Sequence, residues 1–496
     1  MSEKSLKEQQ EQRRKNLQEL EEAGFEAFPF SYTPSHRLAE LQERFAGGEA
    51  GDRHEESVTV AGRIMTLRGM GKVTFATIQD DSGRIQAYFQ RDALEKYRSL
   101  KQFDLGDWIE VEGPLFRTRT GELTVDVQDF RLLVKSLRPL PDKWHGVTDK
   151  EIRYRQRYLD LLADPDSREV FRLRSRAISL VRRWLDERGF HEVETPVLQS
   201  IPGGAEARPF VTHHNALGHD FSLRISLELP LKRLIVGGFE AVYEIGRVFR
   251  NEGLSWKHNP EYTMLELYWA GRDYLDILGL VEELLAFIIK ELTGSTVITW
   301  QGQELDFTPP WPRVDYTEEV ARRAGLDFNL LDEDRLRAWV AENLPGGTEE
   351  EGPLAEQPFG KILDRLYDIY VEPHLQQPTF VMDHPLVISP LARKHRSREG
   401  LVERFEPVVM GMEIGNAFSE LNDAEDQRRR FEEQLRLREA GDEEAHQLDE
   451  DFLTALEYGM PPTGGLGLGI DRIIMLLADQ PSIRDVIIFP LMKPEG

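Results

Sequence analysis

Residues 246–270, with the sequence GRVFRNEGLSWKHNPEYTMLELYWA, decide how the larger part of the chain folds. Two strand-like runs flank a polar loop, and alternate side chains of a strand point to the same face of a sheet. Arg250 and Glu252 therefore share a face, as do Glu266 and Tyr268. The planar arginine fork can bind a phosphate or a carboxylate through two hydrogen bonds. The alternative is a surface hairpin with a salt bridge, which is the more common explanation of an isolated Arg-x-Glu.

A second stretch, GLGLGIDRIIMLL at 465–477, has glycines at three alternate positions before an apolar helix. Glycine in a strand permits the close approach of a ligand, and Arg472 follows in the first turn of the helix. The junction is not a Walker loop, because no Gly-Lys-Ser/Thr follows, and it is not a Rossmann fingerprint. The sequence thus excludes the two nucleotide-binding folds that a glycine-rich junction first suggests.

A third stretch, RFEPVVMGMEIGNAFSELND at 404–423, has carboxylates on both sides of a Met-Gly turn. Glu406 and Glu413 can face each other from paired strands. Three further side chains alternate along one face: Asn416, Phe418 and Glu420. Mg²⁺ bound to phosphates prefers such carboxylates, whereas the alternative is a charged, solvated hairpin. Burying carboxylates without a cation costs free energy. If the three stretches lie together in the fold, the Mg²⁺ site is favoured over the solvated hairpin.

The remainder of the C-terminal part mixes strands and helices. Apolar residues recur at helical spacing over about 167–188, and Gly189 stands where a helix C-terminus favours glycine. Strand-like segments beyond it outnumber short strand–helix–strand alternations. We therefore expect an α+β domain with a large mixed or antiparallel sheet flanked by helices.

Upstream, residues 57–134 predict a small β-barrel. About five short strands follow one another, with one helical stretch between the third and fourth, which is the order of an OB fold. Residues 58–140 carry 13 Lys and Arg against 11 Asp and Glu, a net charge of +2. The barrel is therefore the least acidic part of the chain, which suits nucleic-acid binding, although OB folds also bind sugars and proteins.

The whole chain is acidic and contains no cysteine. Its 496 residues carry a net charge of −26, which argues against indiscriminate nucleic-acid binding, because phosphate binding rests on Lys and Arg. The lack of cysteine excludes disulfides, thiol nucleophiles and Cys-ligated metals. No apolar run approaches the ~20 residues of a membrane helix, and the charged start lacks the apolar core of a secretory signal. We expect a cytoplasmic protein that does not enter a membrane.

The motifs resemble a known family. VETPVLQ (193–199), FRNEG with HNPEYTMLELY (249–268) and GLGLGIDR (465–472) are similar to the three motifs of class II aminoacyl-tRNA synthetases. A barrel ahead of the catalytic domain resembles the subgroup that charges Asp, Asn and Lys. Other segments look like the lysine-specific branch of that subgroup: PGGAEARPF, HHNAL, SPLARKH, GNAFSELND, LEYGMPPTGGLGLGIDR and RDVIIFP. The resemblance covers about residues 58–494 and implies an antiparallel sheet of about six or seven strands, dimeric through the first motif.

The resemblance implies an activity and a division of the chain. The implied reaction is ATP-dependent activation of L-lysine to lysyl-adenylate with release of pyrophosphate, followed by transfer to the 3′ end of tRNA(Lys), in a Mg²⁺-dependent homodimer. The expected parts are a helical extension and linker, the OB-fold anticodon-binding domain, a hinge and the catalytic domain: 1–57, 58–140, 141–170 and 171–496. We expect the first helix, within residues 1–23, to be a solvated appendage.

The resemblance also implies residue roles. Arg250 looks like the arginine that holds the substrate carboxylate and α-phosphate, and Arg472 like that of the γ-phosphate and adenine. Other residues match the ATP site: Glu252, His258, Asn259, Tyr262 and the Mg²⁺ carboxylates Glu406 and Glu413. The lysine pocket is matched, besides Arg250, by Gly204, Glu228, Glu266, Tyr268, Asn416, Phe418 and Glu420. In the barrel, the positions that read the anticodon are Phe75, Gln86 and Glu122.

The sequence departs from the family pattern near the pocket. Ser226-Leu227 stands where many members carry Ala-Pro, and Pro230 where an aromatic residue is usual, which puts the local packing in doubt. Pro at the start of a helix is structurally comfortable. The adjacent His213 and His214 lack a third ligand, and such pairs are more often polar surface or core than a metal site.

The residues favour lysine, and other functions remain open. A substrate with two amines needs carboxylates, and Glu228, Glu266 and Glu420 supply three, whereas an aspartate pocket needs an additional cation. The alternatives are an asparagine or aspartate synthetase, an ATP-dependent amide-forming ligase without the barrel, and an inactive tRNA-binding paralogue. The intact set of Arg250, Arg472, Glu406 and Glu413 argues against the last.

Overall fold

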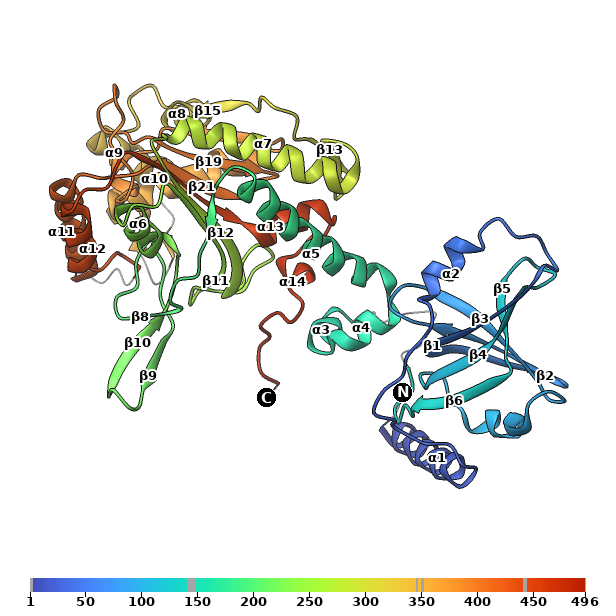
Figure 1. The fold of residues 1–496 in the computed structure, drawn as a ribbon. Helices are drawn as coiled ribbons and strands as arrows, with labels where there is room; N and C mark the ends of the chain where they lie inside the picture. Colours follow the sequence, from blue (N-terminus) through green and yellow to red (C-terminus); the bar gives the residue numbers. More distant parts are fainter. Residues whose placement is uncertain (1–2, 141–148, 345–346, 349–351, 440–443, 496) are drawn as a thin grey trace. The chain divides into compact units, whose positions relative to one another are not determined.

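The chain forms two compact units, one of residues 1–148 and 158–163 and the other of residues 149–157 and 164–496 (Figure 1). The computed structural model describes residues 3–140, 149–344, 347–348, 352–439 and 444–495. Among these described residues, no helix combines the length and the apolar character needed to cross a bilayer. Each unit has its own core and is described by itself.

The first unit is built on a six-stranded sheet in the order β1-β2-β3-β5-β4-β6, in which β1 also pairs with β4. That additional pairing closes a barrel, and the predicted OB fold is confirmed. The last predicted strand run is divided in two at Val127 and Gln128, and the helix between the third and fourth strands is a 3₁₀ helix, η1. Its elements are α1 (Glu3–Glu22), α2 (Leu38–Arg44), β1 (Arg53–Met70), β2 (Val73–Gln79), β3 (Arg84–Gln90), η1 (Glu95–Gln102), β4 (Trp108–Arg117), β5 (Leu123–Asp126) and β6 (Asp129–Val134).

The N-terminal segment differs from the solvated appendage that the sequence predicts. Leu20 of α1 is fully buried and belongs to the hydrophobic core of the barrel, as do Leu38 and Leu41 of α2, which lie beyond the predicted helix. Arg13 donates from Nη1 to the carbonyl oxygen of Ser136 at 2.8 Å. The few apolar residues of the segment are thus anchors that cover the barrel. Of the predicted hinge 141–170, residues 141–148 lie outside the described residues.

The second unit is α+β. Its helices are α3 (Lys150–Arg155), α4 (Arg157–Ala163, beginning in this unit), α5 (Pro165–Asp186), α6 (Glu228–Val236), α7 (Tyr274–Thr293), α8 (Tyr316–Ala324), α9 (Glu333–Asn343), α10 (Phe359–Tyr370), α11 (Ala424–Glu439), α12 (Glu450–Glu457), α13 (Ile470–Leu477) and α14 (Ile483–Val486), with 3₁₀ turns η2 (Leu354–Glu356), η3 (Glu372–His374) and η4 (Leu386–Ile388). Its strands are β7 (His191–Glu192), β8 (Leu198–Gln199), β9 (Val211–His214), β10 (His219–Leu223), β11 (Ala241–Phe249), β12 (Glu261–Ala270), β13 (Val297–Trp300), β14 (Gln303–Asp306), β15 (Arg313–Asp315), β16 (Gly347–Thr348), β17 (Gly352–Pro353), β18 (Thr379–Met382), β19 (Arg404–Val409), β20 (Met412–Glu413), β21 (Gly415–Ser419) and β22 (Thr463–Gly469).

The central sheet is larger than the family resemblance implies. It has nine strands in the order β15-β18-β19-β21-β22-β12-β11-β7, with β20 paired to β19. The interior pairs are antiparallel, as expected, but β15 pairs with β18 and β7 with β11 in parallel. The short β15 and β7 widen the antiparallel sheet at its two edges, so the sheet is mixed.

The two faces of this sheet have different partners. Leu265 and Leu267 of β12 and Leu466 of β22 pack into one core with α5, α7 and α13. Because side chains alternate along a strand, Glu266 and Tyr268 point to the opposite face. The functional stretches therefore converge on the face opposite to α5, α7 and α13, part of which packs against α6, α11 and α12.

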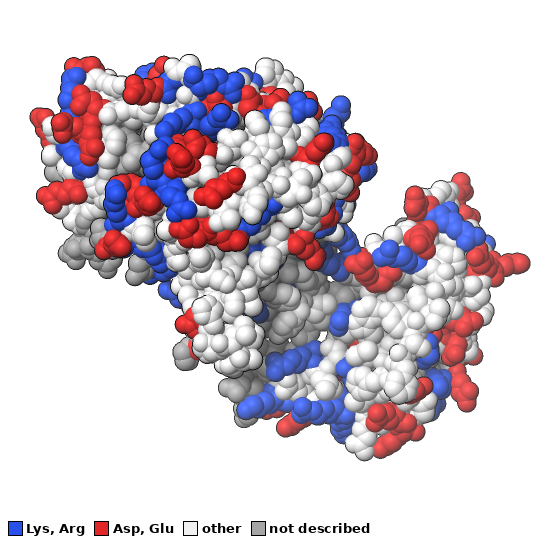
Figure 2. Space-filling view, turned by 60° about the vertical axis from the view of Figure 1, so that its left-hand side comes forward, with Lys and Arg blue, Asp and Glu red and all other residues white. Residues whose placement is uncertain are grey.

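The face shown in Figure 2 carries charges of both signs. On the face in Figure 2, blue and red side chains are interspersed over the larger unit. Such a mixed surface provides no sequence-independent attraction to nucleic acid.

Candidate active site

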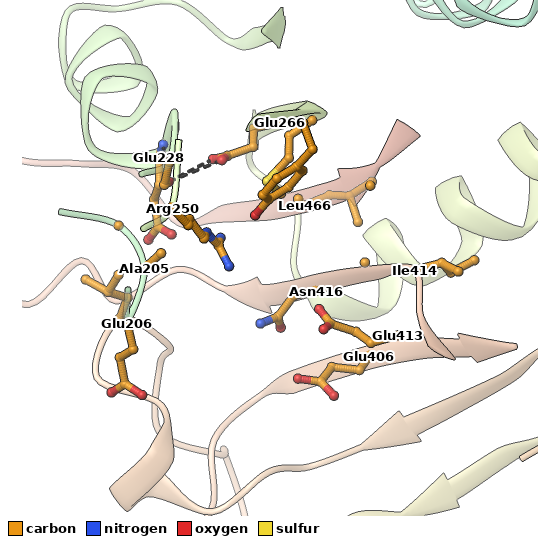
Figure 3. A pocket seen from close by; sticks show the side chains of 18 of the residues that line it. Ala205, Glu206, Glu228, Arg250, Glu266, Glu406, Glu413, Ile414, Asn416 and Leu466 are labelled. Carbon is orange, nitrogen blue, oxygen red and sulfur yellow. Dashed lines mark hydrogen bonds between the residues drawn. The ribbon is translucent and has the colours of Figure 1, made fainter. Parts of the chain in front are cut away.

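A cavity of about 320 Å³ lies on the face of the central sheet opposite to α5, α7 and α13 and brings the three sequence stretches together. Arg250 points into it from the end of β11, while the carboxylates of Glu406 and Glu413 lie side by side across the cavity (Figure 3). The predicted site residues that line it are Gly204, Glu228, Arg250, Glu252, His258, Asn259, Tyr262, Glu266, Tyr268, Glu406, Glu413, Asn416, Phe418 and Arg472. One predicted pocket residue, Glu420, is absent from this lining and lies fully buried behind it.

Arg250 is held at the point where β11 ends. Its Nε donates to the carbonyl oxygen of Ile225 at 3.3 Å, and its guanidinium lies 5.5 Å from the ring centre of Tyr262. Burial opposes the charge, but Tyr262 and nearby carboxylates, Glu252 first, outweigh it and raise the pKa of Arg250. The fork therefore remains charged, and its Nη atoms are available to an anion in the cavity.

Glu266 is a carboxylate of the cavity that is held in place by two donors. Its Oε1 accepts from the backbone N–H of Leu227 at 2.9 Å and from the hydroxyl of Ser226 at 3.1 Å. Burial raises its pKa to about 7. Ser226 and Leu227 are two of the departures from the family pattern, and here they supply the donors that fix this carboxylate. The other departure, Pro230, lies in the first turn of α6, where proline is tolerated.

A buried ion cluster stands beside Glu266. Lys232 of α6 is fully buried, and its Nζ lies 2.5 Å from Oε1 of Glu228. The same ammonium forms an ion pair with Oε2 of Glu420, whose Oε1 has no hydrogen-bond partner among the described residues. Burial raises the pKa of Glu420 to about 8 despite Lys232. Burial of a carboxylate oxygen without a hydrogen-bond donor costs free energy. The cluster therefore lacks a donor at Oε1 of Glu420.

Glycines make room for these groups. A Cβ on Gly465 would lie 1.8 Å from Oε1 of Glu420 and 2.7 Å from Cε1 of Tyr268. Gly204 has a φ of +87°, and a Cβ there would lie 2.6 Å from the hydroxyl oxygen of Ser226. The alternating glycines of β22 therefore admit neighbouring side chains to the sheet face. The sequence predicts close approach of a ligand to these glycines, and in the structure Gly465 is approached by side chains of the protein itself.

The opposite end of the cavity contains two carboxylates and two arginines. Burial favours the neutral acid of Glu406, but Arg404 outweighs it and lowers its pKa to about 2, with Nη2 at 2.6 Å from Oε1. Burial and the neighbouring Glu406 raise the pKa of Glu413. The Met410-Gly411 turn between them has positive φ at both positions, 54° and 63°. The turn thus brings two repelling carboxylates to one place, which a cation would relieve.

Arg472 and the loop after β11 complete this end. Arg472 donates from Nη1 to the carbonyl oxygen of Glu413 at 2.5 Å, and its Nη1 lies 3.5 Å from Oε2 of the same residue. Burial and Arg472 lower the pKa of His258 to about 4, so its ring is neutral. The buried Asn259 donates to the carbonyl oxygen of Glu261 at 2.6 Å, and its Oδ1 is unpartnered among the described residues. These polar groups face a ligand that accepts and donates hydrogen bonds.

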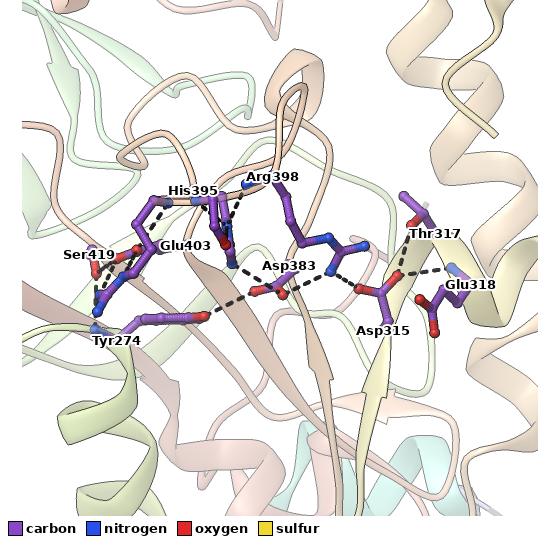
Figure 4. A network of polar contacts seen from close by, with 11 residues as sticks. Tyr274, Asp315, Thr317, Glu318, Asp383, His395, Arg398, Glu403 and Ser419 are labelled. Carbon is purple, nitrogen blue, oxygen red and sulfur yellow. Dashed lines mark hydrogen bonds and ion pairs between the residues drawn. The ribbon is translucent and has the colours of Figure 1, made fainter. Parts of the chain in front are cut away.

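A polar network supports the strand that carries the pocket residues (Figure 4). The hydroxyl of Ser419 donates to Oε2 of Glu403 at 2.6 Å, and Glu403 pairs with Arg396. Beside it, Tyr274 donates to Oδ1 of Asp383 at 3.2 Å, and Arg398 bridges Asp383 and Asp315. Ser419 lies between Phe418 and Glu420, so the network fixes the direction of both side chains.

His213 and His214 lie outside the cavity on an exposed hairpin. Nδ1 of His213 is 2.6 Å from Oδ1 of Asp220, and both side chains are exposed. Among the described residues, no group of three or more His, Cys, Asp or Glu is arranged to hold a metal ion. The two histidines are therefore surface polar residues in this structure.

The three predicted barrel residues share one outer face. Phe75 of β2 lies opposite Tyr88 of β3, with ring centres 5.0 Å apart. Gln86 donates from Nε2 to Oε2 of Glu122 at 2.8 Å and accepts from the hydroxyl of Thr124 at 3.0 Å. An aromatic side chain next to an amide and a carboxylate can stack on one base and read its edge.

Sequence analysis missed several residues around the cavity. Arg404 donates from Nε to Oδ1 of Asn416 at 3.0 Å as well as pairing with Glu406. His384 is buried 3.6 Å from Glu406, and His446 borders the other end. The alternation Arg404-x-Glu406 could have identified Arg404, because it places both side chains on one strand face. No local pattern identifies the two histidines or Lys232.

Comparison with known proteins gives matches over nearly the whole chain. A family model described as tRNA synthetases class II (D, K and N) matches residues 149–493, and one described as an OB-fold nucleic acid binding domain matches residues 58–133. A lysine–tRNA ligase of Deinococcus radiodurans is 55% identical over 99% of this chain and 95% of its own. Lysine–tRNA ligases of Synechococcus sp. (strain CC9605) and Moorella thermoacetica are 54% and 51% identical, covering 96% and 97% of this chain and 95% and 97% of theirs.

The synthetase match includes every residue that lines the cavity, and the second match covers the barrel that carries Phe75, Gln86 and Glu122. The order of the two matches is that of the barrel and the catalytic sheet. The chain belongs to the class II tRNA synthetases of the D, K and N group, with an OB-fold nucleic-acid-binding domain ahead of its synthetase domain.

Proposed function

We propose that this chain is a lysine–tRNA ligase, which activates L-lysine with ATP and transfers it to the 3′ end of tRNA(Lys) for translation. The observation that carries the proposal is the grouping of Glu228, Glu266 and Glu420 beside Arg250 at one end of the cavity. Two amines and one carboxylate of lysine require this combination of charges. The names of the relatives agree with it.

At the lysine end, Arg250 holds the substrate carboxylate, and Glu228 and Glu266 hold the α-amine. Tyr268 and the unpartnered Oε1 of Glu420 receive the ε-ammonium, while Asn416 and Phe418 line the path of the stem and Gly204 leaves room beside it. Tyr268 donates to Oε2 of Glu266 at 3.3 Å, so the two amine sites are connected.

At the ATP end, Glu252, His258 and Asn259 face the nucleotide, Tyr262 stacks on adenine and Arg472 binds the γ-phosphate. The carboxylate of lysine attacks the α-phosphorus in line, forming one P–O bond as the bond to pyrophosphate breaks. Arg250 binds both the attacking carboxylate and the α-phosphate, so it holds the reacting atoms together and spreads the developing charge. A ribose hydroxyl of the tRNA terminus then takes the lysyl group and releases AMP.

Glu406 and Glu413 fit a Mg²⁺ ion that is shared with ATP phosphates. Burial and the neighbouring Glu406 raise the pKa of Glu413, so the two carboxylates are strained by like charge, which a cation relieves. Two carboxylates completed by phosphates and water suit Mg²⁺ better than an all-protein cage. When bound, the ion withdraws charge from the phosphates, and the chain's own part is to hold the two oxygens in place.

ATP–pyrophosphate exchange with the full chain and each of the twenty amino acids tests the proposal. Lysine alone should support rapid exchange. Faster exchange with aspartate or asparagine would assign the chain to another member of its group, and no exchange with any amino acid would indicate an inactive tRNA-binding protein. An amide-forming ligase would instead join an amino acid to a small amine and leave tRNA uncharged.

The remaining parts of the proposal concern the barrel, the oligomer and the compartment. Phe75, Gln86 and Glu122 read the anticodon, within a barrel domain of about 58–140 that is followed by a hinge to about 170 and the catalytic domain.

Exposed apolar side chains along β8 and β9, among them Leu198 and Val211, suit a homodimer. Light scattering should give twice the mass of one chain, and fractionation of the source cell should place the protein in the cytoplasm.

A further inference from the structure

One buried cation at the lysine end takes no part in the proposed reaction. We define the lysine end as Glu228, Glu266, Glu420, Lys232 and Arg250. Lys232 has a fully buried side chain, and its ammonium bridges the carboxylates of Glu228 and Glu420. The rings of Tyr268, Phe418 and Phe452 surround Nζ at 5.9, 6.0 and 6.0 Å. A lysine in such a place is rare unless its charge is compensated, and here two carboxylates compensate it.

Lys232 does not line the cavity, so it acts on a ligand through other residues. Glu228 does line it, and Glu420 has its second oxygen free of hydrogen bonds among the described residues. Burial opposes the charge of Lys232, but Glu228 and Glu420 outweigh it and raise the pKa of the ammonium. The residue is thus a fixed internal counter-ion for Glu228, which lines the cavity, and for Glu420, which is buried next to the lining.

The charges at this end can be counted with every group ionised. Three carboxylates contribute −3, and Lys232 and Arg250 contribute +2, which leaves −1. His446, which also borders the cavity, adds nothing, because burial and Lys232 lower its pKa to about 4. Lysine carries two ammonium groups and one carboxylate, a net charge of +1. The occupied site is therefore neutral, whereas without Lys232 it would retain one uncompensated buried charge, which is costly.

We propose that Lys232 is a specificity-determining positioning residue, which holds Glu228 and Glu420 and sets the lysine end to a net charge of −1, so that it accepts a ligand of net charge +1. A zwitterion of net charge zero then leaves the site charged, and so does a dication. The inference rests on the proposed function, because it takes lysine as the ligand. It adds a residue that touches no substrate but decides how much charge the substrate must bring.

Three variants of the full chain test this count: Lys232→Met, Glu228→Gln, and the double variant Lys232→Met/Glu228→Gln. Their lysine ends carry −2, 0 and −1, so only the double variant keeps the native count. Each is assayed for KM of lysine, KM of ATP and kcat in ATP–pyrophosphate exchange, with melting temperature as a measure of folding. Lys72→Met is the matched control, because it removes an exposed ion pair with Asp92 from the barrel.

We expect Lys232→Met to raise the KM for lysine by about tenfold or more, with KM for ATP changed less than about twofold. The decisive comparison is between Glu228→Gln and the double variant. If charge balance governs binding, removal of Lys232 in the Glu228→Gln background lowers the KM for lysine several-fold, although it removes a native residue. Lys72→Met should match the wild type.

A double variant that binds lysine no better than Glu228→Gln would overturn the proposal, because Lys232 would then have only a structural role. Equal increases in both KM values for Lys232→Met would overturn it as well. Should Lys232→Met fail to fold, the other two variants still decide, since replacing both members of a buried pair by uncharged residues is often tolerated. A wild type that shows no exchange with lysine refutes the proposed function instead, and is recognised before any variant is compared.

Discussion

The cavity of the second unit and the outer face of the barrel, the two proposed binding sites, differ in how far their polar groups are shielded from water. In the cavity, Glu266 has two donors on one oxygen, and Glu228 and Glu420 share a buried ammonium. On the barrel, Phe75 and Gln86 are half-buried and Glu122 is exposed. Charge interactions strengthen as water is excluded. A single substitution should therefore cost much more in the cavity than on the barrel.

The largest effect is expected for Arg250→Lys. The change keeps the charge but loses the planar fork, which we propose binds the carboxylate and the α-phosphate at once. ATP–pyrophosphate exchange, measured as kcat/KM for lysine, should fall by roughly a hundredfold or more. Activity within a few-fold of the wild type would contradict the role given to Arg250 and place the reacting anions elsewhere in the cavity.

The next effect in size is expected for Glu420→Gln. The amide keeps the shape but cannot neutralise the ε-ammonium, so KM for lysine should rise by an amount equivalent to about 2–4 kcal/mol. KM for ATP, measured in the same exchange assay, should stay nearly constant. If both values rise equally, Glu420 supports the ATP end rather than the side-chain site.

Phe75→Ala tests the outer face of the barrel. Loss of one stacked base should weaken tRNA binding by about 1–3 kcal/mol, seen as a higher KM for tRNA in aminoacylation. Exchange without tRNA should be unaffected, because Phe75 belongs to the first unit. Unchanged charging at subsaturating tRNA would show that this face does not read the anticodon.

The contrast also explains which features the sequence could predict. Strand alternation placed Glu266 with Tyr268, and Glu406 near Glu413 across a Met-Gly turn, because the register of a strand is a local property. The OB fold and the α+β class followed from the same periodicity and are confirmed. The residue roles inside the cavity remain predictions.

Features that depend on tertiary packing were not predictable. Lys232 lies four residues after Glu228 on a helix, a spacing that usually marks an exposed pair, and only the folded chain reveals Glu420 on its other side. In the same way, Leu20, Leu38 and Leu41 are too few and too scattered to form a helical stripe, so their burial in the barrel core was missed. Single anchors of this kind leave no periodic signal.

The smallest expected effect is a dependence of lysine binding on pH that tRNA binding does not share. Burial raises the pKa of Glu420 to about 8 and that of Glu266 to about 7, so the empty site retains a share of protons at neutral pH. The groups that face Glu420 are Lys232, Glu228, Glu266 and Tyr268, so the apparent pKa belongs to the cluster. Lysine binds the ionised form of the cluster. Because the carboxyl pKa is raised, the ionised fraction still increases as pH rises above 7.

KM for lysine should therefore fall by about fivefold between pH 7 and pH 8, the increase expected for an acid whose pKa is near 8. Calorimetry in buffers of different ionisation enthalpy should show proton release on lysine binding at pH 7. Over the same range, KM for tRNA should change little, because Phe75 and Gln86 do not titrate. A flat pH profile for lysine together with no proton release would mean that the cluster is already fully ionised, with Lys232 providing more compensation than the burial of the carboxylates removes.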